Sequence, residues 1–326
     1  MKDRRQGPRP GLVSRARGVT IYWRHPSPPL ITVIPAYLAR PHEPPQLQRC
    51  TAALAAQPLV RWVLVVDDGS PLPFPSLPPV VELLRMDRNR GPAAARNRGL
   101  ARALELGAET ILFTDVDCIP ALGWAEAMQA QLRTGGVVAA GGVIRSHGTT
   151  LLDRYHDFNG TLNGRWILPE RAGLLYAPTC NLAVRATAVA DLRFDERLIT
   201  GEDVDFCYRL RDRGTIALAP RAVVHHDYAY ETTWRGLPTF LRMFRRYGEG
   251  DALLWEKHPE LRGADSEACA AADLLAPPPK DPSDYRRGAE RRVRPRRYRL
   301  PMAILRRMAR LAYKRGQARP RQWHQP

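Results

Sequence analysis

Between residues 30 and 114 the sequence alternates between short apolar runs of strand length and longer segments with helical patterning. Such alternation is typical of strand–helix–strand units, in which parallel strands are joined by helices that cross over the sheet. We therefore predict an α/β fold with a doubly wound, mostly parallel sheet flanked by helices. The strands are expected at residues 30–35, 60–66, 80–86 and 110–114, and the helices at residues 46–57 and 91–107.

Polar or turn residues follow three of these predicted strands, at "PAY" (35–37), "DDGS" (67–70) and "DVD" (115–117). In doubly wound sheets the crevice beyond the carboxyl ends of the strands is where ligands bind. If the chain stays extended, Asp115 and Asp117 point to one side of the pleat and both carboxylates face this crevice. Paired oxygen ligands suit Mg²⁺ or Mn²⁺. An isolated Asp-X-Asp is more often a turn or a cap, so the surrounding motifs must decide.

The formal net charge of +17 is concentrated at the two ends of the 326-residue chain. Residues 1–29 carry +6 and residues 285–326 carry +14, whereas the chain between them carries −3. The charge and the proline content predict four regions. These are a basic N-terminal arm (1–29), a folded domain (30–262), a Pro-rich linker (263–284) and a basic C-terminal helical tail (285–326).

The tail contains an amphipathic pattern over residues 300–315. Its apolar residues recur at helical spacing, at Ile304, Leu305, Met308, Leu311 and Ala312, and its cations are Arg306, Arg307, Arg310 and Lys314. A basic amphipathic helix suits an anionic membrane surface. The same stripe would equally suit packing on the folded domain, and an acidic partner or peptide is a third option.

Residues 233–250 form a second helical pattern, which we expect to pack on the folded domain. Its apolar residues are Trp234, Leu237, Phe240, Leu241 and Phe244.

No run of 18 or more apolar residues occurs, and no apolar segment follows the basic start, so we expect a cytoplasmic protein, at most peripheral at the inner face of the membrane. The cysteines are scattered and never spaced as C-x-x-C, which argues against a disulfide framework or a zinc knuckle. We expect them to be reduced and mostly buried. They are Cys50, Cys118, Cys180, Cys207 and Cys269.

Six motifs occur in a fixed order, namely "ITVIPAY", "VVDDGS", "NRGPAAARNRGL", "ILFTDVDCIP", "CNLAVRA" and "FDERLITGEDVDFCYRLRDRG". In this order the chain resembles the family-two nucleotide-sugar glycosyltransferases over about residues 30–248. The resemblance implies a GT-A fold, an inverting hexosyltransferase-like reaction, a divalent Mn²⁺ or Mg²⁺ cofactor and a nucleotide-diphosphate sugar donor, for which we expect a UDP-sugar. It also implies a nucleotide-binding half (30–120) and an acceptor half (121–262), whereas the acceptor stays unknown.

The same resemblance assigns the nucleotide pocket. Pro35, Ala36 and Tyr37 would line the base pocket, and Asp68 would accept a hydrogen bond from a base N–H. Leu38 departs from the family pattern, which usually has Asn after the Tyr, so the turn around Tyr37 is less defined.

The diphosphate and metal residues are also implied by the resemblance. Arg96 would be the cation beside the diphosphate, because its planar donors match phosphate oxygens. Asp117 would coordinate the metal directly, and Asp115 would reach the ribose or the metal. His225 or His226, in "AVVHHDY", would complete the metal shell, although a histidine beside a strand is more often structural.

In the motif "GEDVDFCYRL" the resemblance makes Asp203 the general base, with Glu202 beside it. We expect the helix start to lower the pKa of Asp203 and the neighbours Glu202 and Asp205 to oppose this, which leaves Asp203 ionised at neutral pH. The alternative is an ordinary acidic helix start.

Two other functions fit parts of the sequence. A nucleotidyltransferase could share the fold and the metal, but the Gly-rich loop that such enzymes place after the first strand is missing. A nucleic-acid-binding protein would explain the basic arms and leave the acidic motifs unexplained, so we expect no specific nucleic acid partner.

Overall fold

The computed structural model describes residues 14–16, 19–21, 30–162, 165–166, 174–261 and 298–318. The predicted linker (263–284) and Cys269 lie outside these residues, as does most of the N-terminal arm. In the described part of that arm, β1 (Ser14–Ala16) pairs antiparallel with β2 (Val19–Ile21).

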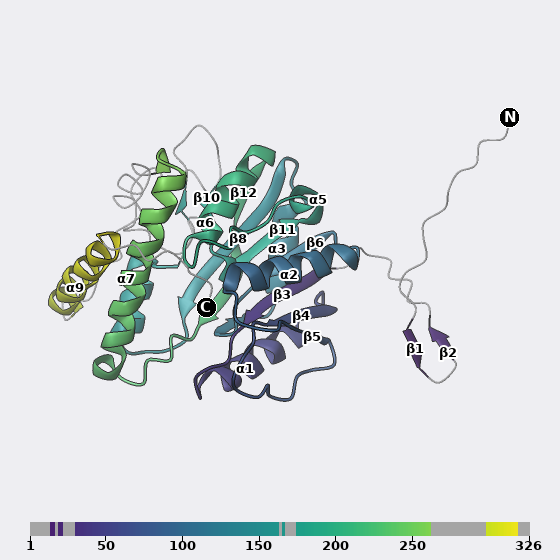
Figure 1. Cartoon of the computed structure of the whole chain (residues 1–326), viewed down its shortest axis with the longest axis horizontal. Helices are drawn as coiled ribbons and strands as arrows, with labels where there is room; N and C mark the ends of the chain where they lie inside the picture. The colour runs from purple at the N-terminus through teal and green to yellow at the C-terminus, as the bar shows by residue number, and fades with distance from the viewer. Residues whose placement is uncertain are drawn as a thin grey trace.

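The main sheet runs in the order β5-β4-β3-β6-β11-β8-β12-β7 (Figure 1). Its strands are β3 (Leu30–Ala36), β4 (Trp62–Asp67), β5 (Val81–Arg85), β6 (Thr110–Phe113), β7 (Cys118–Pro120), β8 (Val137–Ser146), β11 (Leu182–Arg185) and β12 (Thr215–His226). The half formed by β5, β4, β3 and β6 is entirely parallel. In the other half β8 and β12 are parallel, whereas β11 and β7 run antiparallel to their neighbours. The predicted α/β fold with a mostly parallel sheet is confirmed.

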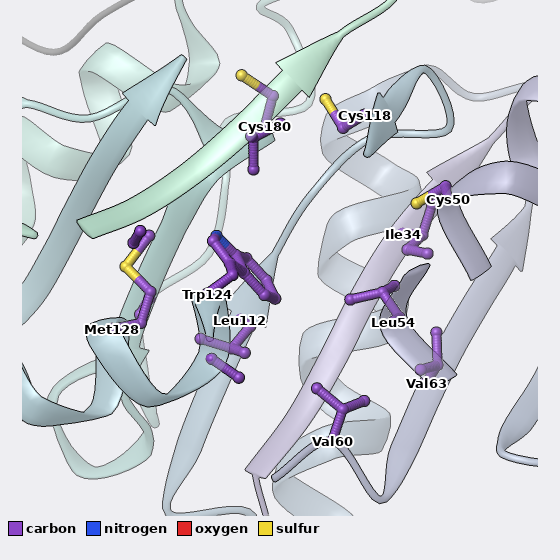
Figure 2. Packing of buried hydrophobic residues seen from close by; sticks show 14 of the residues in the cluster. Ile34, Cys50, Leu54, Val60, Val63, Leu112, Cys118, Trp124, Met128 and Cys180 are labelled. Carbon is purple, nitrogen blue, oxygen red and sulfur yellow. The ribbon is translucent and has the colours of Figure 1, made fainter. Parts of the chain in front are cut away.

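Helices cover both faces of this sheet. Helices α1 (Glu43–Ala55) and α3 (Trp124–Leu132) pack on one face, and α2 (Pro92–Glu105) and α6 (Glu202–Leu210) pack on the other. Figure 2 shows the first of these cores, in which Leu54 of α1 and Met128 of α3 lie among side chains of the strands. Consecutive side chains of β3 bury on opposite faces, which explains why the strand is apolar at every position except Thr32.

The four predicted strands and two predicted helices all occur, within a few residues of their expected bounds. The smaller described elements are α4 (Leu151–Asn159), β9 (Arg165–Trp166), β10 (Leu174–Tyr176), η1 (Thr179–Asn181), α5 (Ala186–Val189) and η2 (Arg211–Arg213). Cys50, Cys118, Cys180 and Cys207 are free and buried, as predicted (Figure 2 labels three of them).

Helices α7 (Thr233–Lys257) and α9 (Arg299–Gln317) form an outer layer, in which α9 lies against α7 on the side away from the sheet (Figure 1). Phe240 of α7 is wholly buried in their contact, whereas Trp234 is 81% exposed, so the prediction that Trp234 packs on the domain is wrong. Trp234 lies in the first turn of α7, where the adjacent Thr233 makes the contact with α4 by accepting the N–H of Leu151 at 3.2 Å. None of the described helices combines the length and apolar character of a bilayer span.

The two helices cross with their backbones in close contact at a pair of glycines. A Cβ added to Gly248 of α7 would collide with the carbonyl oxygen of Tyr313, and one added to Gly316 of α9 would collide with that of Arg245. Only residues without a side chain allow this approach. The described part of the tail is therefore a packed element of the fold.

We predict that Gly248→Ala lowers the free energy of unfolding by about 1–3 kcal/mol, because the new methyl group pushes α9 away from α7. The opposite result would be expected of an unpacked helix, in which alanine is the better helix former by about 1 kcal/mol. Denaturant unfolding of the full chain measures the change. The matched control is Gly135→Ala, where an added Cβ meets nothing within 4 Å and the backbone is unstrained. Equal stability of the two variants would contradict the close crossing.

Candidate active site

The loops after β3 and β4 are tied to each other at the carboxyl edge of the sheet. The N–H of Leu38 donates to Ser70 Oγ at 2.8 Å, and the N–H of Asp68 donates to the carbonyl of Ala36 at 2.8 Å. Leu38 is wholly buried, whereas the preceding Tyr37 is 42% exposed. The residue that departs from the family pattern thus serves as a core side chain, and the ring of Tyr37 stays accessible to a ligand.

The two carboxylates of the "DDGS" turn already have partners. Asp67 is wholly buried and bonded to Arg85 at 2.5 Å. Asp68 accepts the backbone N–H groups of Arg90 and Gly91, at 2.7 and 2.8 Å, and so holds the loop that enters α2. Burial raises the pKa of Asp68. Each carboxylate oxygen of Asp68 has a second lone pair, so these two bonds still allow it to accept from a base. That bond stays a prediction.

The chain turns directly after β6. The N–H of Cys118 donates to the carbonyl of Asp115 at 3.1 Å, which closes a turn over residues 115–118. The prediction that an extended pleat carries Asp115 and Asp117 to one side is therefore wrong. The turn still keeps the two carboxylates close enough for Asp115 to raise the pKa of Asp117, in addition to the larger effect of burial.

Arg96 joins the turn after β6 to the start of α6. Its side chain is 4% exposed, and its two terminal nitrogens donate to Glu202 at 2.6 Å and to Asp115 at 2.8 Å. Burial by itself would lower the pKa of Arg96, but these two acids raise it. Both ends of the guanidinium fork are thus taken by carboxylates, so Arg96 positions two acids, and its predicted contact with a diphosphate stays a prediction. The side chain of the neighbouring Asn97 exchanges two hydrogen bonds with the backbone of Phe194: it donates to the carbonyl at 3.0 Å and accepts the N–H at 2.8 Å.

The acids at the start of α6 differ in their surroundings. Burial raises the pKa of both Glu202 and Asp203, and their mutual repulsion adds to the rise at Glu202. The helix start does favour the charged form of Asp203, as predicted, through the N–H of Val204 at 2.9 Å, and Arg96 acts in the same direction. Desolvation, which sequence reasoning did not include, outweighs both, so the pKa of Asp203 is raised.

Asp205 has a separate, structural role. It is wholly buried and contacts Arg209, Lys257 and His258 at 2.6 to 2.8 Å. Although burial opposes it, these cationic partners lower the pKa of Asp205. Asp205 is therefore committed to holding α6 against the end of α7.

His226 is the histidine that faces the "DVD" turn. Its Nε2 lies 3.5 Å from Asp117 Oδ1, and it pairs with Cys118 across β12 and β7. Because neighbouring residues of a strand point to opposite faces, His225 lies on the other side, where His147 and Asp157 influence its pKa. The prediction that either histidine could complete the metal shell is thus corrected in favour of His226.

Asp117, Cys118 and His226 could together hold a metal ion. One donor atom from each lies within 4.8 Å of the others, and the carboxylate and imidazole donors fit a divalent cation such as Mn²⁺. The Cys118 thiol, whose pKa is raised by burial, lies 3.6 Å from Asp117 Oδ1. Sequence reasoning missed Cys118, although its place directly after "DVD" is a signal that could have revealed it.

Asn181 is a second residue that sequence reasoning missed. It is wholly buried, accepts from Trp124 Nε1 at 2.7 Å and donates to the carbonyls of Val143 and Ala222 at 3.0 Å. These carbonyls lie beside the register shift between β8 and β12. Strand β12 carries His226. A lone Asn within the apolar motif "CNLAVRA" is the signal for such a brace.

Comparisons with known proteins find glycosyltransferases. The model of glycosyl transferase family 2 matches residues 32–189. The chain is 33% identical over 211 residues to the pre-mycofactocin glycosyltransferases of two strains of Mycobacterium tuberculosis, CDC 1551 / Oshkosh and ATCC 25618 / H37Rv. The alignment covers 61% of this chain and 43% of each relative, so the chain spans less than half the length of these curated relatives.

A solved structure shares the fold. It is the mannosyltransferase PcManGT from Pyrobaculum calidifontis in complex with GDP-Man and Mn²⁺, which is 17% identical, with a TM-score of 0.59. The match covers 89% of this chain and 87% of that one, and so includes both halves of the sheet.

We predict that Arg96→Ala lowers the free energy of unfolding by about 3 kcal/mol, because Glu202 is then buried without a cation. Adding Glu202→Gln should restore part of this loss, whereas Asp115 is more exposed and can be hydrated. A double-mutant cycle by denaturant unfolding measures both effects. The control pair is Arg235 and Glu231, exposed at 78% and 69%, where loss of the arginine should cost well under about 1 kcal/mol. Similar losses in the two pairs would contradict the bracing role of Arg96.

Proposed function

Since residues 32–189 belong to glycosyl transferase family 2 and the chain has a GT-A fold, we propose that it transfers a sugar, with inversion, from a nucleotide-diphosphate sugar to an acceptor hydroxyl. The observation that carries this proposal is the bridge from Asp115 through Arg96 to Glu202. It holds the acidic start of α6, with Asp203, beside the strand ends where a nucleotide sugar would bind. The family match favours this reaction over the nucleotidyltransferase alternative.

In the proposed reaction Asp203 is the general base. The acceptor oxygen forms a bond to the anomeric carbon while the bond from that carbon to the phosphate oxygen breaks. The nucleoside diphosphate leaves with the electron pair of that bond, and the hydroxyl proton passes to Asp203. A raised pKa supports the role, because an ionised carboxylate of higher pKa binds a proton more strongly. Glu202 is held by Arg96 at 2.6 Å, which makes it the weaker candidate.

Asp117 and His226 are the residues proposed to hold a divalent cation, Mn²⁺ or Mg²⁺, with Asp115 turned toward Arg96. A cation bound there would neutralise the charge that develops on the diphosphate. The Mn²⁺ and GDP-Man bound to the mannosyltransferase of similar fold support this assignment.

The donor pocket is proposed to consist of Pro35, Ala36, Tyr37 and Asp68, and we retain a UDP-sugar as the expected donor. The exposed ring of Tyr37 supports packing on a base. The curated relatives are named for pre-mycofactocin, which makes that compound the first acceptor to test. We further propose a cytoplasmic location, at most peripheral at the inner face of the membrane.

We predict that Asp203→Asn lowers turnover by about 100-fold or more and leaves donor affinity nearly unchanged, because the amide keeps the size of the carboxylate and cannot accept the proton. Released nucleoside diphosphate, measured over a panel of nucleotide sugars, gives the rate, and calorimetry gives the affinity. Glu202→Gln is the comparison. An inactive Glu202→Gln beside a normally active Asp203→Asn would move the base to Glu202.

We predict that Asp117→Asn and His226→Ala each weaken binding of Mn²⁺, because the first replaces a charged oxygen ligand with a neutral one and the second removes an imidazole donor, and that EDTA abolishes turnover. Electron paramagnetic resonance of free Mn²⁺ measures binding without reference to activity. His225→Ala is the matched control and should bind Mn²⁺ like the native chain. Full turnover in excess EDTA, or a larger loss of Mn²⁺ in the His225 variant, would refute the assignment.

A further inference from the structure

Helix α9 has two different faces. Its inner face packs against α4 and α7 and buries Met302, Leu305, Ala309 and Gly316. Successive positions in this set are three, four and seven residues apart, so their side chains form one stripe along the helix. Of the five apolar residues in the predicted tail stripe, only Leu305 is fully buried.

The outer face of α9 carries a second apolar row. Leu300 is 70% exposed, and Ile304 and Leu311 are each 52% exposed. Their spacing of four and seven residues puts them on one line, on the side opposite the buried stripe. Packing within the described part of the chain therefore does not account for these three side chains.

Cations surround this apolar row. Between Arg299 and Gln317 the helix has no acidic residue. Its six cations are all exposed: Arg299, Arg306, Arg307, Arg310, Lys314 and Arg315. Figure 1 shows α9 at the margin of the molecule, outside α7, so a flat surface could approach its outer face.

We propose that the outer face of α9 docks on an anionic lipid bilayer. Leu300, Ile304 and Leu311 would enter the boundary between headgroups and acyl chains, and the surrounding cations would meet the lipid phosphates. Nucleic acid would use the cations alone and leave the apolar row in water, so the bilayer accounts for more of the surface.

The test is co-sedimentation of the full-length protein with vesicles of phosphatidylcholine, with and without phosphatidylglycerol. The native chain should bind only the anionic vesicles, at low salt, and added salt should release it. Arg307→Glu/Arg310→Glu should weaken binding about tenfold or more. Leu300→Ser/Ile304→Ser/Leu311→Ser should weaken it with little change in salt dependence, because it removes only apolar contacts.

The matched control is Arg61→Glu/Arg133→Glu, which makes the same change of charge at exposed positions outside α9 and should bind like the native chain. Since all the substituted residues are exposed, each variant should keep the native free energy of unfolding. The proposal is overturned if the native chain ignores anionic vesicles, or if the control loses as much binding as the α9 variants. Full binding by the serine variant would also overturn it and would point to nucleic acid or an acidic protein held by charge alone.

Discussion

The buried guanidinium of Arg96 holds the two halves of the site together. It lies on α2 and binds one carboxylate from the end of β6 and one from the start of α6, elements that are distant in sequence. A buried carboxylate is tolerated only with a partner, so Glu202 depends on this cation, whereas the more exposed Asp115 is oriented by it. Asp203 is next to the pair but has no arginine bond of its own. The bridge thus fixes where Asp203 lies and leaves it free to exchange a proton.

The same bridge leaves the site short of positive charge. Four carboxylates, those of Asp115, Asp117, Glu202 and Asp203, gather around one guanidinium and one histidine. Burial raises the pKa of Asp117, Glu202 and Asp203, and repulsion from neighbouring carboxylates adds to each rise. A diphosphate would add further negative charge. A divalent cation at Asp117 and His226 would relieve both problems, an argument for a metal that does not rely on family resemblance.

The sequence predicted the four strands of the parallel half of the sheet and the two helices between them, because burial on both faces of a parallel sheet imposes continuous apolar runs. It could not choose between His225 and His226, since the register of β12 against β7 decides which histidine meets Asp117. It also left out the main effect on the pKa of Asp203, because the residues that desolvate this carboxylate are far along the chain. The prediction of an extended chain at Asp115 failed for a local reason: the N–H of Cys118 donates to the carbonyl of Asp115, and this hydrogen bond closes a turn.

The tail shows why helical periodicity alone does not reveal what a helix touches. Its apolar residues serve two faces, and the glycine contact between α7 and α9 decides which of them is buried. Gly248 meets α9, whereas a side chain at Gly250, about 200° further round α7, would collide with Thr200 before the start of α6. Because α7 is held closely on both sides, it acts as a spacer of one helix diameter, about 10 Å, between α9 and the loop that leads to Asp203. Any surface that binds the outer face of α9 would therefore lie at a fixed distance from the active site and in a fixed orientation to it.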